Sequence, residues 1–199
     1  MDLAGRFEHY TDAGDTETGK VSSRYDVNRY FGLRGTIASG FRAPTLAEED
    51  WSNMSVAPTT ASGYIPVESA GARMLGARPL KPERSTSFSA GFVLNPLDDL
   101  HVTVDAYQID LRDRIMAAGV YSGPQAIEAL EMNGFSIPAG ISSKAVTAQY
   151  YANAASTRTR GLDITANYLT RLGRFGHINW DVAANFNQTN IRHVANDAN

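Results

Sequence analysis

Carboxylates are the first side chains of this sequence that could do chemistry. A pair of Asp or Glu residues can hydrolyse a glycosidic bond, one as acid and the other as base or nucleophile. Asp98-Asp99 lies in a short turn, where Asp is common, and Glu48-Glu49-Asp50 lies in a polar loop. Asp105, Asp163 and Asp181 each fall on the polar side of an alternating segment. We therefore expect turn and interior residues here, no catalytic residue, and a protein that is not an enzyme.

Metal chemistry has equally little support in the sequence. The four histidines are His9, His101, His177 and His193, and no two of them have the spacing of a ligand pair. The chain has no cysteine, which excludes a thiolate metal site, a Cys nucleophile and a disulfide scaffold. We predict no metal site and no cofactor.

The elements that must position these side chains are mostly β-strands. Apolar and polar residues alternate with a period of two, as in 178–187, where Ile178, Trp180 and Val182 oppose Asn179 and Asp181. In 101–107 the alternation slips after Tyr107, which indicates either a β-bulge or an exit from an apolar zone. The pattern predicts seven strands, over 2–10, 20–27, 31–42, 85–94, 101–107, 161–168 and 178–187.

One segment has the features of a helix. Residues 122–134 begin with a Ser cap candidate, carry Pro124 near the first turn and end at Gly134. It falls between two predicted strands. We therefore expect this helix to belong to a connection rather than to the sheet.

Strand length and the connections favour a membrane barrel. The longer alternating runs approach the roughly 9–11 residues of a tilted transmembrane strand, whereas strands of soluble proteins are usually about 5–6 residues long. Short links at 28–29, 95–99 and 171–174 alternate with a medium link at 11–19 and long links at 43–83 and 115–157. Outer-membrane barrels have short periplasmic turns and longer extracellular loops. The predicted fold class is all-β, an antiparallel transmembrane β-barrel segment of about seven long strands.

Composition excludes other classes. The 199 residues carry 18 basic and 21 acidic side chains, so the net charge of −3 offers no basic field for nucleic acid. No apolar run approaches the roughly 20 residues that a spanning helix needs. We expect no nucleic-acid partner.

Four motifs resemble those of TonB-dependent outer-membrane receptors, in that family's order. The first resembles the end of a barrel strand with its Gly-Phe-Arg-Ala-Pro segment, and the second a Leu-Lys-Pro-Glu element. The third is similar to an Asp-x-Tyr-x-Ile-Asp-x-x-Asp-x-Ile pattern and the fourth to an Asn-x-x-x-x-Arg-x-x-Gly-x-Asp/Glu signature. They are Phe31–Glu48, Leu80–Ser85, Asp105–Ile115 and Asn153–Ile164.

The resemblance implies a function and its partners. It implies energised uptake across the bacterial outer membrane of a scarce nutrient, such as a siderophore, another metal chelate, cobalamin or an oligosaccharide. The implied partners are the TonB-ExbB-ExbD complex, acting through a plug domain, together with outer-membrane lipid and a small nutrient ligand. Such plugged barrels have about 22 strands. We therefore expect residues 1–199 to be a partial barrel domain with extracellular loops at 43–83 and 115–157, and the signal peptide, plug and final strands to lie outside it.

Arginines and loop aromatics are the expected contacts of a ligand. Arg34 shares the parity of the polar side chains, whereas Arg158 and Arg160 share that of the apolar Leu162. An Arg facing lipid at mid-depth costs about 2–4 kcal/mol, but this cost fades toward the extracellular end, where we place Arg158 and Arg160. The predicted ligand-binding residues are Arg42, Trp51, Tyr64, Tyr121, Tyr150 and Tyr151.

Two alternatives remain open at this point. A passive porin would have the same alternation without the four motifs. A soluble β-sandwich with carbohydrate-binding or hydrolase activity would bury its apolar strand faces between two sheets.

Overall fold

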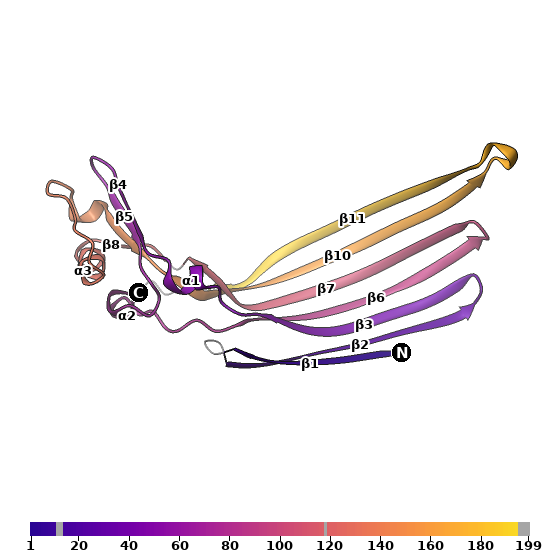
Figure 1. Cartoon of the computed structure of the whole chain (residues 1–199), viewed down its shortest axis with the longest axis horizontal. Helices are drawn as coiled ribbons and strands as arrows, with labels where there is room; N and C mark the ends of the chain where they lie inside the picture. The colour runs from indigo at the N-terminus through magenta and orange to yellow at the C-terminus, as the bar shows by residue number, and fades with distance from the viewer. Residues whose placement is uncertain (11–13, 118, 195–199) are drawn as a thin grey trace.

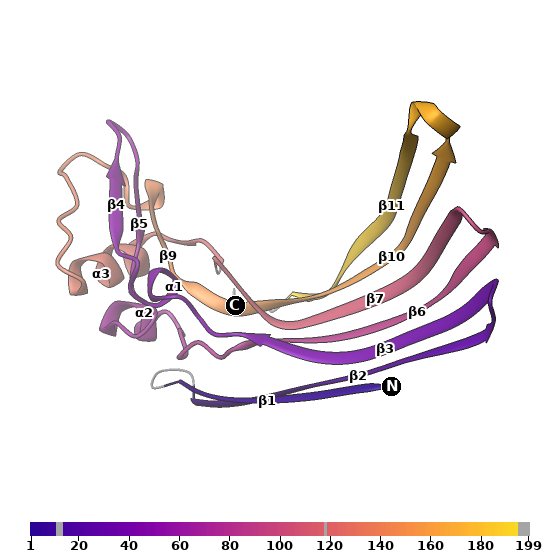
Figure 2. The same cartoon turned by 45° about the vertical axis from the view of Figure 1, so that its right-hand side comes forward.

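The computed structural model describes residues 1–10, 14–117 and 119–194. One large antiparallel sheet extends from a smaller folded unit at one of its ends (Figure 1, Figure 2). The strand order is β1-β2-β3-β6-β7-β10-β11, so strands that neighbour each other in the sheet also follow each other along the chain when the loop elements are left out. Its strands are β1 Asp2–Tyr10, β2 Gly14–Asn28, β3 Phe31–Arg42, β6 Glu83–Leu97, β7 Leu100–Ala117, β10 Tyr151–Arg171 and β11 His177–Val194.

All seven predicted strands are present, but most are longer than the alternation indicated. β2 begins at Gly14, so most of the predicted link 11–19 is strand, and residues 11–13 lie outside the described residues. β10 begins at Tyr151, so the predicted loop 115–157 is shorter than expected. Backbone pairing continues beyond the apolar zone because ladder hydrogen bonds do not depend on side-chain polarity. The alternation therefore marks the apolar zone and not the strand ends.

The slip of alternation in β7 is an exit from the apolar zone and not a bulge. The register of β6 and β7 is continuous from Arg84 opposite Arg112 to Leu94 opposite Val102. An irregularity does occur in β7, but further along, where the register with β10 shifts and Asp113 takes a φ of 55°.

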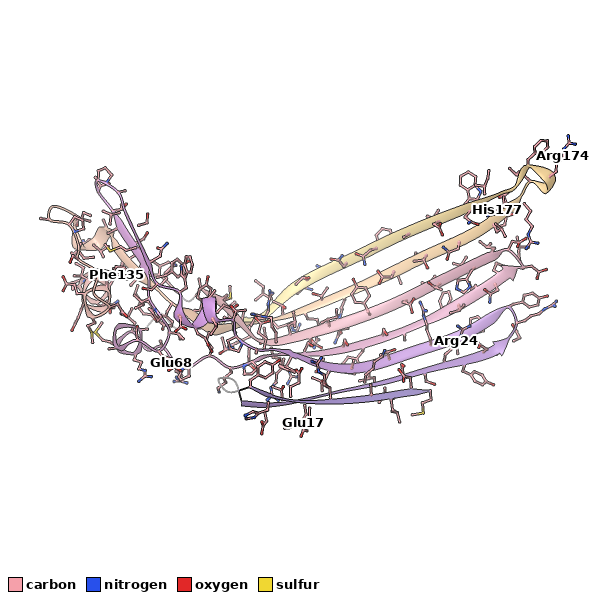
Figure 3. All side chains as sticks on the ribbon, in the orientation of Figure 1. Glu17, Arg24, Glu68, Phe135, Arg174 and His177 are labelled. Atoms are coloured by element: carbon pink, nitrogen blue, oxygen red, sulfur yellow. The ribbon has the colours of Figure 1, made fainter. Side chains whose placement is uncertain are left out.

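The two faces of the large sheet differ in polarity. On one face the apolar side chains are exposed: Ile37 at 55%, Phe88 at 43% and Val182 at 64%. Side chains project from both sides of the strands, without a second sheet over either side in the part of the chain that is described (Figure 3). A soluble sandwich would bury such residues, so that alternative is wrong. We call this surface the apolar face and the opposite one the polar face.

The short turns lie at the end of the sheet away from the folded unit. The first is held by Asn28, whose Oδ1 accepts hydrogen bonds from the backbone N–H groups of Tyr30 (2.8 Å) and Phe31 (2.9 Å). Asn favours such turns because its side chain bonds to backbone two residues on. A 3₁₀ turn, Gly173–Phe175, joins β10 to β11.

The two long connections fold together at the other end. We call residues 43–82 and 119–150 the loop unit. Its sheet has the order β4-β5-β9-β8, and β5 from the first connection pairs in parallel with β9 from the second. The strands are β4 Asn53–Val56, β5 Ala61–Tyr64, β8 Tyr121–Ser122 and β9 Val146–Gln149; the helices are α1 Leu46–Asp50, α2 Ala70–Met74, α3 Pro124–Met132 and a 3₁₀ turn at Ser143–Ala145.

The loop unit has its own hydrophobic core. Leu130 of α3 is fully buried, and Ile65, Val67 and Val146 are at most 2% exposed. Burying one such side chain stabilises by about 1.5–3 kcal/mol. The helix predicted within 122–134 is confirmed as α3, whereas α1 and α2 were not predicted. None of the described helices is both long and apolar enough to cross a membrane.

Candidate functional site

The four sequence motifs meet in one hydrogen-bonded network where the large sheet joins the loop unit. Arg42 belongs to the first motif, Lys81 and Glu83 to the second, Ile115 to the third and Asn153 to the fourth. These residues come from β3, β6, β7, β10 and the segment before β6. We call this network the motif junction.

Arg42 is the centre of one half of the junction. Its guanidinium donates to Glu83 through Nε (3.0 Å) and Nη2 (2.8 Å), and to Glu48 through Nη1 (2.8 Å) and Nη2 (2.9 Å). Glu83 Oε1 also accepts from the backbone N–H of Ile115 at 2.7 Å. Planar guanidinium and carboxylate groups match in this paired geometry. Arg42 thus links the end of β3 to α1 and β6, and Glu83 extends this link to β7.

Glu48 is positioned by the local sequence around it. Thr45 caps α1, and Glu48 at the third helical position bonds back to the backbone N–H of Thr45 at 2.8 Å, which completes a capping box. The hydrogen bonds from Arg42 hold the pKa of the Glu48 carboxyl below its ordinary value, although partial burial opposes this shift. Glu48 is therefore charged at neutral pH, and Arg42 is committed to two carboxylates.

Asn153 is the centre of the other half. Its Oδ1 accepts from the backbone N–H of Lys81, and its Nδ2 donates to the carbonyls of Lys81 (2.8 Å) and Asp113 (2.7 Å). The left-handed backbone of Asp113 turns this carbonyl out of the regular ladder. Asn153 therefore satisfies backbone groups of Lys81, which precedes β6, and of Asp113, where the register of β7 is irregular.

The predicted loop aromatics fall into two groups. Tyr150 is 1% exposed, stacks on Tyr121 with ring centroids 5.7 Å apart, and lies within the core of the loop unit. Trp51 is 48% exposed, and Tyr64 packs at a tilt against Tyr151 at 5.9 Å. The structure brings Tyr64 together with Tyr151 and Tyr121 together with Tyr150. Only the accessible members can meet a ligand, so Tyr150 contributes packing.

On the polar face, Arg34 crosses a neighbouring strand to reach Asp105. Arg34, Gly91 and Asp105 are registered partners on β3, β6 and β7. The guanidinium donates to Asp105 through Nε at 2.7 Å and also through Nη2. A Cβ on Gly91 would lie 2.7 Å from Asp105 Cγ and closer still to the Val104 carbonyl oxygen. Glycine is therefore needed here for close approach.

A second crossing repeats this arrangement with an aromatic ring. Tyr107 of β7 lies over Gly161 of β10, and Asn185 of β11 donates to its hydroxyl at 3.1 Å. A Cβ on Gly161 would lie 2.7 Å from Tyr107 Cε1. Asn185 also donates to Asp163. Sequence reasoning missed both crossings, although glycine at a polar-face position of a strand was their visible signal.

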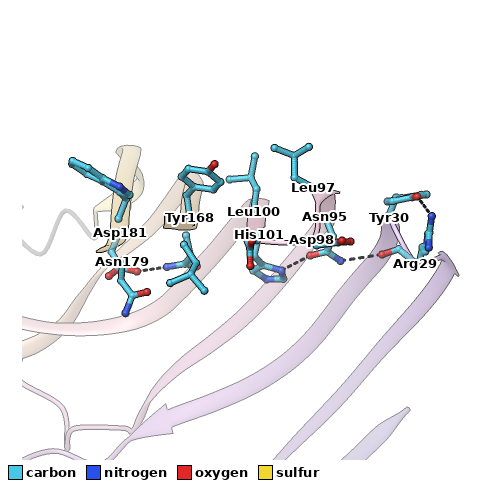
Figure 4. Close-up of a pocket in the computed structure, with 14 residues that line it drawn as sticks. Arg29, Tyr30, Asn95, Leu97, Asp98, Leu100, His101, Tyr168, Asn179 and Asp181 are labelled. Atoms are coloured by element: carbon cyan, nitrogen blue, oxygen red, sulfur yellow. Dashed lines mark hydrogen bonds between the residues drawn. The ribbon is translucent and has the colours of Figure 1, made fainter. Parts of the chain in front are cut away.

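A cavity of about 660 Å³ lies at the short-turn end (Figure 4). His101 Nδ1 and Asn95 Oδ1 are 2.6 Å apart in its lining, and Asn167 donates to Asp181 at 2.5 Å. These contacts tie neighbouring strands to one another. Among the described residues, no three His, Asp or Glu side chains gather in a way that could hold a metal ion.

These features define a class of protein: the wall of a transmembrane β-barrel that carries a folded loop unit at one end. The hallmarks of that class are an exposed apolar face, a polar face with side chains spanning the strands, and short turns at one end of the sheet with the long connections at the other. The chain belongs to the TonB dependent receptor-like β-barrel family, whose model matches residues 1–199. The predicted family and fold class are confirmed, and the proteins of this family are receptors and transporters.

Solved structures support the same fold. The siderophore receptor PirA from Pseudomonas aeruginosa matches with a TM-score of 0.63 and 16% identity, over 94% of this chain and 31% of that one. A variant of the ferric enterobactin receptor PfeA from the same species, in complex with enterobactin, has a TM-score of 0.61, 15% identity and coverage of 92% and 24%. The RagAB peptide importer has a TM-score of 0.59, 12% identity and coverage of 96% and 20%.

The chain therefore spans less than a third of the length of these structures. At identities of 12–16% the likeness establishes the fold and not the ligand. No curated protein matches the sequence.

Proposed function

We propose that residues 1–199 form part of the barrel of a receptor in the bacterial outer membrane that takes up a scarce nutrient with energy from TonB. The observation that carries this proposal is the two-faced sheet: exposed apolar side chains on one side and spanning polar contacts on the other. The apolar face meets lipid, the polar face lines the interior, the short turns are periplasmic and the loop unit is extracellular. Coupling runs through a plug domain outside these residues to TonB-ExbB-ExbD.

The orientation of the two faces is testable by spin labelling in the full-length receptor. Labels on the apolar face should report hydrocarbon, and labels on the polar face should report the interior. The sites are Val104, Ile164 and Val182 against Asp105, Asp163 and Asp181. Equal accessibility of both sets to a water-soluble relaxation agent would contradict the assignment.

The cargo that we propose first is a ferric siderophore. The similar structures include two siderophore receptors. The rings of Trp51 and Tyr64 in the loop unit, with that of Tyr151 at the start of β10, can stack on a flat aryl group. Another metal chelate, cobalamin or an oligosaccharide remains the alternative cargo. Arg42 stays a predicted ligand contact, but only through the parts of its guanidinium that the two carboxylates leave accessible.

Uptake of radiolabelled ferric siderophore by cells that produce the full-length receptor tests this function. Uptake should require both the receptor gene and tonB. Trp51→Ala combined with Tyr151→Ala should weaken binding about tenfold, because stacking contributes roughly 0.5–1.5 kcal/mol per pair. Phe175→Ala is the matched control, since Phe175 is 78% exposed at the short-turn end. Uptake that persists without TonB would contradict the energised mechanism.

A further inference from the structure

A row of small side chains crosses the apolar face at one level. Ser23, Gly35, Ala90 and Ala106 are successive registered partners on β2, β3, β6 and β7. They contribute to the lining of a groove of about 720 Å³. Three strand intervals of about 4.8 Å give the row a length of roughly 14 Å, near half of the roughly 30 Å hydrocarbon core. We call it the small-residue groove.

Larger side chains form the walls of this groove. The row on the loop-unit side contains Ile37 opposite Phe88, and the row on the short-turn side contains Leu33 opposite Phe92. All four side chains are at least 37% exposed, as expected for residues that face lipid. Over β3 and β6 the groove is therefore flanked by apolar side chains on both sides.

One end of the groove is polar. The row that contains Ile37 and Phe88 continues through Gln108 of β7 to Arg160 of β10. Arg160 donates through Nε to the side-chain oxygen of Gln108 at 2.8 Å. Both residues also line the groove.

This end carries an excess of positive charge. Arg84, Arg112, Arg158 and Arg160 have the parity of the apolar face on β6, β7 and β10, all on the loop-unit side of the groove. Asp110 contributes a carboxylate among them and pairs with Arg158 at 2.5 Å. Four guanidinium groups therefore outnumber this carboxylate. An anionic group is the charge complement of such a surface.

The groove runs obliquely from hydrocarbon toward the headgroups. On β3 the apolar face continues beyond Ile37 to Phe41, whereas on β10 its last apolar side chain before Arg160 is Leu162. Ile37 and Arg160 nevertheless belong to one registered row. The row thus starts inside the apolar zone at β3 and ends beyond that zone, on its loop-unit side, at β10. Strand tilts of roughly 35–45° require such a slope.

We propose that the small-residue groove holds one acyl chain of a phosphorylated lipid of the outer leaflet, with the lipid phosphate bound at Arg158 and Arg160. The inference rests on the proposed function for its orientation, since it needs the loop unit to be extracellular. A basic cluster beside an apolar groove is a common way to bind a lipid headgroup. Arg binds phosphate through paired N–H donors, which suits a phosphomonoester.

Native mass spectrometry of the full-length receptor in detergent tests the site. The probes are bisphosphorylated lipid A, the same lipid after enzymatic dephosphorylation, and inorganic phosphate as competitor. The intact receptor should retain the phosphorylated lipid, and inorganic phosphate should not displace it. R158Q combined with R160Q should weaken retention about thirtyfold. Equal retention of the dephosphorylated lipid, or unchanged retention by this double variant, would overturn the proposal.

The acyl chain is tested by filling the groove. Ala90→Leu places a larger side chain in it, whereas Ala166→Leu makes the same change elsewhere on the apolar face, opposite Val102 and Val182. We expect only the first change to reduce retention, and equal effects would overturn the groove assignment. Uptake assays on the same variants separate the two proposals. If the intact receptor imports siderophore but binds no lipid, the lipid site alone is refuted. If it binds lipid but imports nothing, the proposed function alone is refuted.

Discussion

Replacing Gly161 by alanine should destabilise the barrel through one ring. The new Cβ would lie 2.7 Å from Tyr107 Cε1, whereas carbon atoms ordinarily approach to about 3.5–4.0 Å. The ring must therefore move by roughly 1 Å and give up its hydrogen bond from Asn185. Overpacking of this kind costs about 1–3 kcal/mol, and the better strand propensity of alanine offsets about 0.5–1 kcal/mol of it. We expect a net loss of up to about 2.5 kcal/mol in the free energy of unfolding.

A double-mutant cycle isolates the cause. In a Tyr107→Ala background the clash is gone, so Gly161→Ala should be neutral or should stabilise by about 0.5 kcal/mol. The coupling between the two sites should then be about 1–3 kcal/mol. Gly35→Ala is the control, because the nearest heavy atom to a Cβ there is the Ser89 carbonyl oxygen at 3.5 Å, an ordinary contact.

Urea unfolding of the full-length receptor refolded into detergent, followed by tryptophan fluorescence, measures all four members of the cycle. Additive effects of Gly161→Ala and Tyr107→Ala would refute the reasoning. They would mean that the backbone, and not the ring, sets the need for glycine at this position.

Three further changes have definite expected outcomes. Gly91→Ala should also destabilise by about 1–3 kcal/mol in urea unfolding, but trimming side chains should not rescue it, since its Cβ would meet the carbonyl oxygen of Val104. The Glu48 carboxyl has a lowered pKa, so its contribution to stability is present above its ordinary pKa of 4.5 and is lost as the pH falls through the lower folded value. Resistance of the loop unit to proteolysis should therefore decline upon acidification below pH 4.5. Arg42→Gln should make this decline smaller, while the hydrogen bonds from Thr45 keep part of it, at a cost of about 1 kcal/mol or less because solvent screens the interaction. Asn153→Ala should cost about 1–3 kcal/mol and speed hydrogen exchange at the Lys81 amide, whose acceptor it removes. Unchanged exchange there would contradict the role of Asn153.

The strands could be predicted because one property, sidedness, repeats along each of them. Leu162, Ile164 and Ala166 alternate with polar residues, and the pairing of β10 follows from that pattern. The strand ends could not be predicted in this way. Arg158 and Arg160 continue the same parity with charged side chains, so the pattern loses its contrast while the ladder of hydrogen bonds continues.

Of the three described α-helices, one could be predicted from the sequence and two were missed, because they differ in length. α3 was predictable from Pro124 at its start and Gly134 after its end. α1 and α2 have five residues each, which is too few for a helical period to show. The capping box of Thr45 and Glu48 is nevertheless visible in the sequence and marks the start of α1.

The candidate ligand site was the least predictable part. An aromatic side chain in a loop can contact a ligand or pack in a hydrophobic core. The sequence around Tyr150 does not show which of these two roles it has. The decision depends on the parallel pairing of β5 with β9, which joins two connections far apart in the chain. Such a non-local contact leaves no periodic trace in either segment.

The motif junction explains why the motifs identify a family and not a cargo. Arg42, Glu83 and Asn153 form hydrogen bonds with neighbouring strands and with backbone groups. They do so where β3, β6, β7 and β10 leave the apolar zone. Every barrel that carries folded loops on tilted strands must satisfy the same backbone groups at this boundary, whatever it imports. Under the proposed function, ligand specificity falls to the segments between the motifs, where Trp51 and Tyr151 lie. Exchanging residues 49–79 and 119–151 with those of a receptor for a different ligand should therefore transfer specificity, while the junction and the barrel stay intact.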